Sequence, residues 1–148
     1  MTEMMNQVHN ALLPDEPDYA QAAQLGKSAL PHLMQLVENG DTDLAAKATY
    51  LAAFINAEGS IAILETAANS HDPIVRIAAA GAMQYLDEVP EALIYRLLAD
   101  EEIGARQFAL RAVEIHRPDN IMSRLQEIRA NDPVFELREY VDQIIQNM

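Results

Sequence analysis

The stretch Asp72-Pro-Ile-Val-Arg-Ile-Ala-Ala-Ala-Gly-Ala-Met-Gln-Tyr-Leu86 decides the fold. Its apolar residues recur every three or four positions, which is the spacing of one face of an α-helix. Similar helices are predicted to begin near Asp43, Glu102 and Asp132, so the pattern returns about every 30 residues. Self-similarity at this period is typical of a solenoid, in which small helical units stack on one another.

Each of these helices, here called B helices, follows another apolar segment of helical length, here called an A helix. The A helices are predicted over residues 29–38, 60–69, 90–99 and 119–130, and the last B helix over 134–146. Asp72-Pro73 and Asp132-Pro133 each predict a helix start with Asp as the N-cap and Pro at the first helical position. In the clearest B helix the predicted buried stripe is Val75, Ala78, Ala79, Ala82, Met83 and Leu86.

The predicted fold is therefore an all-α solenoid, a right-handed superhelix of about five antiparallel helix pairs in a single domain over residues 1–148. Residues 1–26 are expected to form a degenerate capping pair. The four units that follow are expected to span residues 27–56, 57–87, 88–117 and 118–148.

Composition limits the classes of partner. Ten basic residues against 23 acidic residues give a net charge of −13, and residues 1–75 alone carry two basic and ten acidic side chains. Because phosphate neutralisation supplies most non-specific affinity for nucleic acid, this balance argues against DNA, RNA and anionic membranes as partners. It favours a protein partner, and a basic one would be attracted.

The sequence also bears on the compartment. Cysteine is absent, which is compatible with a reducing environment. The N-terminus carries no signal-peptide pattern, and no apolar run approaches the roughly 20 residues that cross a bilayer. We expect a cytoplasmic protein.

The helix Asp72–Leu86 and the joint Ala23-Gln-Leu-Gly26…Ala29-Leu-Pro-His-Leu33 resemble HEAT repeats, in particular the short Ala-rich bacterial type of phycobilisome-lyase-like proteins. The resemblance covers residues 20–146. It implies a ladder in which a turn acid of one unit pairs with a B-helix base. The matching acids are Asp43, Asp72 and Glu102, the matching bases are Lys47, Arg76 and Arg106, and the last basic position falls on either Glu136 or Arg138.

No catalytic pattern stands out. The five glycines form no phosphate-cradling loop, and no Gly-x-Ser-x-Gly turn is present. The histidines are too widely spaced for a helical metal pair: His9, His32, His71 and His116. The acids at 41–43 and 100–102 fit helix caps and solvated turns better than a calcium loop. We therefore predict no enzyme activity, no cofactor and no metal site.

The candidate binding surface is the outer ridge of the B helices, which lines the concave side in solenoids of this type. Its predicted residues are Leu44, Ala48, Leu51, Ile77, Ala80, Gln84, Gln107, Leu110 and Glu114. Several are more apolar than a solvated face requires. Packing between neighbouring B helices accounts for most of them, and an apolar groove rimmed by acids is the alternative.

Two functions fit this sequence. The first is a non-enzymatic scaffold or adaptor that binds a protein partner on the concave B-helix face. The alternative is an accessory subunit of a lyase-like or chaperone system that handles a cofactor or a client protein. Homodimerisation through the ridge is a further possibility.

Overall fold

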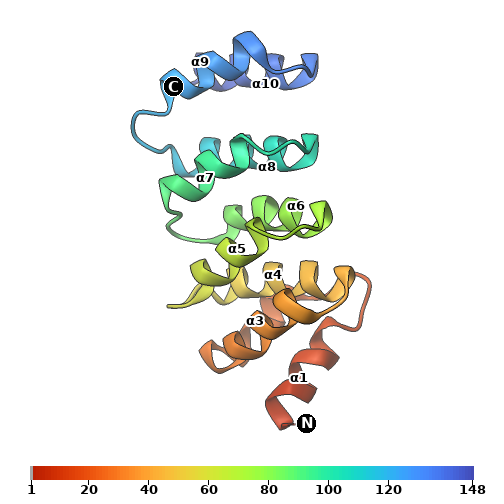
Figure 1. Ribbon diagram of the computed structural model, residues 1–148. Helices are drawn as coiled ribbons and strands as arrows, with labels where there is room; N and C mark the ends of the chain where they lie inside the picture. The colour runs from red at the N-terminus through yellow and green to blue at the C-terminus, as the bar shows by residue number, and fades with distance from the viewer. Residues whose placement is uncertain (1) are drawn as a thin grey trace.

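Residues 2–148 are described by a computed structural model, in which ten α-helices and three short 3-10 helices follow one another and no strand occurs. Successive helix pairs stack in chain order from the N-terminus to the C-terminus (Figure 1). The predicted all-α solenoid is therefore confirmed.

Four units each contain an A helix and a B helix. The A helices pack beside one another along one side of the stack, and the B helices along the other side (Figure 1). The pairs are α3 (Leu30–Asn39) with α4 (Thr42–Ile55), α5 (Ser60–Ala68) with α6 (Pro73–Ala82), α7 (Glu91–Leu98) with α8 (Ile103–His116), and α9 (Met122–Asn131) with α10 (Phe135–Gln146). The 3-10 helix η3 (Met83–Tyr85) extends α6 by one turn.

The N-terminal segment is less regular. It consists of α1 (Glu3–Leu12), the one-turn helix α2 (Tyr19–Ala22) and the 3-10 helices η1 (Ala23–Leu25) and η2 (Lys27–Ala29). Lys47 ties this segment to α4, because its ammonium group donates to the carbonyl of Leu12 at 3.1 Å and to that of Pro14 at 2.8 Å. A charge that is almost fully buried is thereby satisfied by backbone oxygens.

The core is built from small and branched side chains. All six residues of the stripe predicted in the clearest B helix are buried, from Val75 to Leu86. The alanines carry little bulk, so the A helices and the neighbouring B helices can approach closely, while Met83 fills the remaining volume.

The turns between A and B helices are fixed by three buried or half-buried aspartates, Asp72, Asp100 and Asp132. Each accepts a hydrogen bond at 2.9 Å from the backbone N–H two residues later. Asp72 is the predicted N-cap of α6. The same prediction for Asp132 is wrong, because α10 begins only at Phe135.

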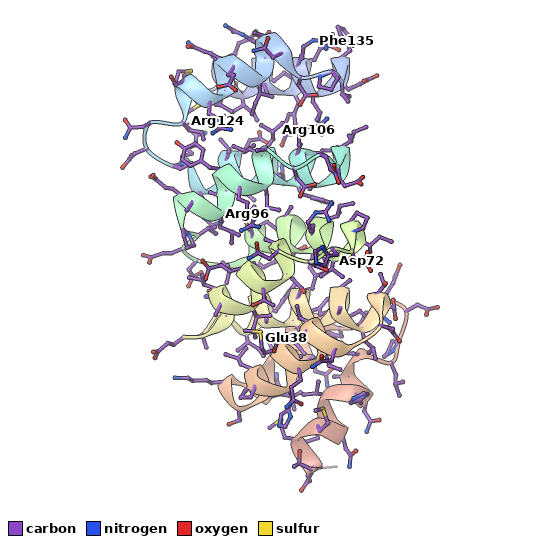
Figure 2. The ribbon with its side chains drawn as sticks, viewed as in Figure 1. Glu38, Asp72, Arg96, Arg106, Arg124 and Phe135 are labelled. Atoms are coloured by element: carbon purple, nitrogen blue, oxygen red, sulfur yellow. The ribbon has the colours of Figure 1, made fainter. Side chains whose placement is uncertain are left out.

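These aspartates also receive a side chain from the preceding unit. Arg76 Nε donates to Asp100 Oδ2 at 3.0 Å, and Arg106 Nε donates to Asp132 Oδ2 at 2.8 Å. The Thr42 hydroxyl donates to Asp72 and is the largest cause that lowers the pKa of this carboxyl group. Asp72 and Arg106 lie at the same edge of the stack (Figure 2).

The ladder that the resemblance implied is thus present, but some of the residues that form it differ from those expected. Glu102 is not the acid of its turn, because Asp100 takes that position. Asp43 pairs with Lys47 within α4, at 2.9 Å, and does not bridge two units. The last base is Arg138 and not Glu136, because Arg138 Nη1 donates to the carbonyl of Asp132 at 2.6 Å.

Replacing Arg106 by Ala should lower the free energy of unfolding by about 3–5 kcal/mol, because it leaves the Asp132 carboxylate buried without its cation. The side chains of this pair are only 11% and 4% exposed. The matched control is Arg129→Ala, whose pair with Asp142 is 43% and 47% exposed and should contribute less than about 1 kcal/mol. Urea unfolding followed by circular dichroism measures both, and equal losses would contradict this account.

Candidate functional site

The B-helix side of the stack carries the exposed apolar surface. Eight large hydrophobic side chains are exposed among residues 2–148, and six of them belong to α6, η3, α8 or α10: Ile74, Tyr85, Ile103, Phe108, Ile115 and Phe135. None of the eight belongs to the A helices α3, α5, α7 and α9. Exposed apolar side chains are the usual anchors of protein interfaces, and the B-type elements carry six of the eight, so this side is the better candidate for a binding face.

The predicted ridge is divided by the structure. Ala48, Leu51, Ala80 and Leu110 have no exposed surface and pack between neighbouring B helices. These four side chains cannot contact a partner while the units stay stacked. They belong to the core and not to the candidate binding surface. Gln107 is exposed, whereas the remaining four are partly exposed: Leu44, Ile77, Gln84 and Glu114.

Gln107 lies in a hollow between α8 and α10. The hollow has a volume of about 380 Å³, and its lining combines Ile103, Val134 and Leu137 with the polar side chains of Gln107, Glu136 and Tyr140. Tyr140 donates its hydroxyl to the carboxylate of Glu114. Two residues of the predicted ridge therefore lie at this hollow or on the contact beside it.

Four aromatic rings form a second feature of this side, here called the aromatic strip: Tyr19, Tyr50, Phe54 and Tyr85. They come from α2, α4 and η3, so the strip crosses three consecutive units. Phe54 and Tyr85 stack with ring centroids 4.3 Å apart, and Tyr19 lies 5.4 Å from Phe54 and 5.8 Å from Tyr50. Such pairs contribute about 0.5–1.5 kcal/mol each beyond their buried area.

The strip exists because one position in α6 has no side chain. A methyl group on Gly81 would overlap the hydroxyl of Tyr50, so any larger residue there would displace that ring. Tyr85 is 42% exposed and forms the outermost ring, whereas the other three are half-buried.

The sequence analysis did not predict the strip, because the apolar spacing of a single helix does not show which aromatic rings meet across neighbouring units. A signal for it was present in the sequence. Tyr19 and Tyr50 are 31 positions apart, and so are Phe54 and Tyr85. One repeat period between aromatic residues places their rings side by side on adjacent B-type helices.

Burial raises the pKa values of two tyrosines in the strip. Burial raises the pKa of Tyr19 to about 12, with smaller contributions from Tyr50 and from the carboxylate of Asp43. Burial, followed by Tyr85, also raises the pKa of Tyr50. The phenol groups of Tyr19 and Tyr50 therefore stay neutral at physiological pH.

Other features are more modest. An open hollow of about 560 Å³ lies between α1 and the α2–η1 segment, and its polar lining is mainly amide: Gln7, Asn10, Gln21 and Gln24. His116 contacts the carbonyl of Met83 at 2.9 Å, which joins the end of α8 to η3. No group of three or more metal-binding side chains occurs among residues 2–148, and no helix in that range is long and apolar enough to cross a membrane.

Neither a protein-family model nor a curated protein matches this sequence. Among solved structures, a chain described as "The structure of the complex of CpcE and CpcF of phycocyanin lyase from Nostoc sp. PCC7120" superposes with a TM-score of 0.73. The two chains share one helical-repeat fold. The match covers 95% of this chain and 96% of the other at 22% sequence identity. The resemblance to phycobilisome-lyase-like HEAT repeats is thereby confirmed at the level of the fold.

Replacing Gly81 by Ala should destabilise the protein by about 1–3 kcal/mol through overpacking, although Ala is the better helix former. Tyr50→Phe should be nearly neutral, because Phe keeps the ring that packs against the core and loses only the hydroxyl group. The double variant should regain much of the loss, because it lacks the hydroxyl that overlaps the new methyl group. Thermal unfolding of all three tests this, and an unchanged stability of Gly81→Ala would show that the ring moves aside freely.

Stability should fall above about pH 10 in part because of Tyr19. Its pKa is higher in the folded chain than the usual 10.0, so its contribution is complete below pH 10 and is lost as pH rises toward 12. Tyr19→Phe removes the ionising group and should flatten the pH dependence of the free energy of unfolding in this range. The measurement is urea unfolding between about pH 9 and pH 12, and identical slopes for both proteins would contradict it.

Proposed function

We propose that this protein is an accessory subunit of a lyase-like system, which binds a second protein through its B-helix side. The observation that carries the proposal is the likeness in fold to a chain from a two-protein complex of phycocyanin lyase, over nearly the whole of both chains. A subunit of this kind assembles with a partner and handles a client, and a solenoid offers an extended surface for such contacts.

The distribution of apolar surface supports the choice of face. Tyr85 and Ile115 are exposed near the ends of neighbouring B-type elements, while Ile103 and Phe135 are exposed at the starts of α8 and α10. A partner that covered these side chains would remove them from water, which is the dominant favourable term in most protein association. The A helices present no comparable groups within residues 2–148.

The proposal assigns no catalytic group to this chain. The sequence alone led to the expectation of a module that binds a protein partner. The proposal keeps that expectation and places the module in a lyase-like system. In this role the protein stabilises or presents a client, and the chemical step belongs to the assembled system.

The test is capture of the tagged protein from its own cells, with the bound proteins identified by mass spectrometry and the visible absorption of the eluate recorded. We expect a stoichiometric protein of the same helical-repeat type, a chromophore-carrying client, or both. The double variant Tyr85→Asp/Ile115→Asp should lose the partner, because two charges would then face its apolar surface.

The control places the same two charges on the opposite side, at the exposed alanines of α5 and α7: Ala62→Asp/Ala92→Asp. It should retain the partner, and circular dichroism should be unchanged in both variants. Loss of the partner only in the A-helix variant would exclude the B-helix side. A partner outside helical-repeat and lyase systems would exclude the proposed role.

A further inference from the structure

The hollow between α8 and α10 contains one charged side chain, that of Glu136. Glu136 is exposed, and none of the ion pairs among residues 2–148 includes it. Two more carboxylates belong to its surroundings. Glu102 directly precedes Ile103, which lines the hollow, and Glu139 follows one turn later in α10. The hollow is therefore a largely apolar depression that carries an unpaired negative charge.

The arginines of α8 and α10 do not neutralise this charge. Arg106 is 11% exposed and donates two hydrogen bonds to the Asp132 carboxylate, at 2.8 and 3.3 Å. Arg138 donates to the carbonyl of Asp132 at 2.6 Å, and Arg111 pairs with Glu114 at 3.7 Å. Each arginine is thus engaged by another group, and none of the three belongs to the lining of the hollow. A cation for the carboxylate in the hollow has to come from outside the chain.

A partner on the B-helix side would cover this carboxylate. Ile103 and Phe135 are two of the exposed apolar side chains that the partner is proposed to bury. Ile103 lines the same hollow as Glu136, and Phe135 precedes Glu136 at the start of α10 (Figure 2). A surface that closes over both would remove water from the carboxylate between them. Because an ionised carboxylate that loses its water without gaining a cation is strongly destabilising, the partner has to bring a positive charge to this point.

We propose that the hollow between α8 and α10 receives a lysine side chain of the partner protein. The four-carbon stem of lysine can lie along the three apolar residues of the lining while its ammonium group stays at the polar ones. The ammonium group has three donors, and three side chains of the lining offer an acceptor: the carboxylate of Glu136, the amide oxygen of Gln107 and the hydroxyl oxygen of Tyr140. The Tyr140 hydroxyl already donates to Glu114, so its oxygen is available only as an acceptor.

This inference rests on the proposed function for the presence of a partner on the B-helix side, and it adds the chemistry that the partner must present there. An apolar side chain would fill the same space but would leave the carboxylate without a cation. The charge of the lining therefore favours lysine over leucine or phenylalanine at this position.

The first test needs no partner and uses the full chain with butylammonium, which reproduces the lysine side chain. Two related probes are 1-butanol, which lacks the charge, and butylguanidinium, which reproduces arginine. NMR titration of the methyl signals follows binding, and butylammonium should shift those of the apolar lining: Ile103, Val134 and Leu137. It should bind more tightly than either related probe, because it alone combines the stem with a compact charge and three donors.

Glu136→Gln keeps the shape of the side chain and removes its charge, so it should raise the Kd of butylammonium about two- to fivefold, as expected for a partly exposed ion pair. The matched control is Glu139→Gln, which removes an exposed carboxylate of the same helix that is not part of the lining and should leave the Kd unchanged. Absence of shifts at the three methyl-bearing residues, equal binding of 1-butanol, or equal losses in the two variants would overturn the inference. Butylguanidinium that bound as tightly as butylammonium would overturn the choice of lysine.

The second test uses the complex captured from cells. A carbodiimide joins a carboxylate to an amine only where the two are in contact, and mass spectrometry identifies the joined residues. We expect a cross-link between Glu136 and a lysine of the partner, which Glu136→Gln abolishes and Glu139→Gln retains. A complex in which Glu136 forms no such cross-link, while other carboxylates of the chain do, would contradict the proposal.

The two proposals fail separately. If butylammonium does not bind in the hollow but the helical-repeat partner is captured, the accessory role stands and the assignment of the hollow falls. If butylammonium binds there through Glu136 but no such partner or client is captured, the hollow remains an ammonium site and the accessory role falls.

Discussion

The arrangement of the units depends on one repeated contact, in which a side chain from one B helix reaches the aspartate in the next turn. In both Arg76 and Arg106, Nε donates to the aspartate of the next turn. Nη1 of the same guanidinium group donates to backbone carbonyls in the turn that precedes the arginine's own helix. A planar group with donors in fixed directions can hold two turns at a set separation, which a lysine could not do as well. The stacking distance and the register of the B helices follow from this contact, together with the alanines that allow the helices to approach.

The aromatic strip is a consequence of that register. Because adjacent B helices are held one period apart, side chains at equivalent positions become neighbours, and Phe54 therefore stacks on Tyr85. Gly81 of α6 lies one repeat period after Tyr50 of α4, and its lack of a side chain leaves room for the Tyr50 ring. The same register buries Leu51 and Leu110 between helices. One geometric constraint thus decides which apolar residues become core and which remain exposed.

Most of the fold could be predicted from the sequence, because period, capping residues and alanine-rich stripes all act locally. The helix of Asp72–Leu86 and its buried stripe are examples. The identity of the ladder acids could not be predicted in the same way, because the choice between Asp100 and Glu102 depends on which carboxylate the turn directs toward Arg76. The ridge was assigned from single-helix periodicity, which does not distinguish a face that meets solvent from one that meets a neighbouring helix. The aromatic strip depends on contacts between units, and only the spacing of 31 positions hinted at it.

The hollow between α8 and α10 has a consequence for the cooperativity of unfolding. The first three B helices lie in close contact along their length, whereas α10 leaves about 380 Å³ open beside α8. In a linear array, each unit is stabilised by its own pairing and by the interface with its neighbours, and a terminal unit has only one such interface. Among the four helix pairs, α9–α10 is thus the one whose local opening requires the least free energy, and its backbone amides should exchange with solvent hydrogen before those of the other three pairs. The solenoid therefore combines a central block of closely packed B helices, α4, α6 and α8, with a C-terminal helix pair that is held to this block more loosely.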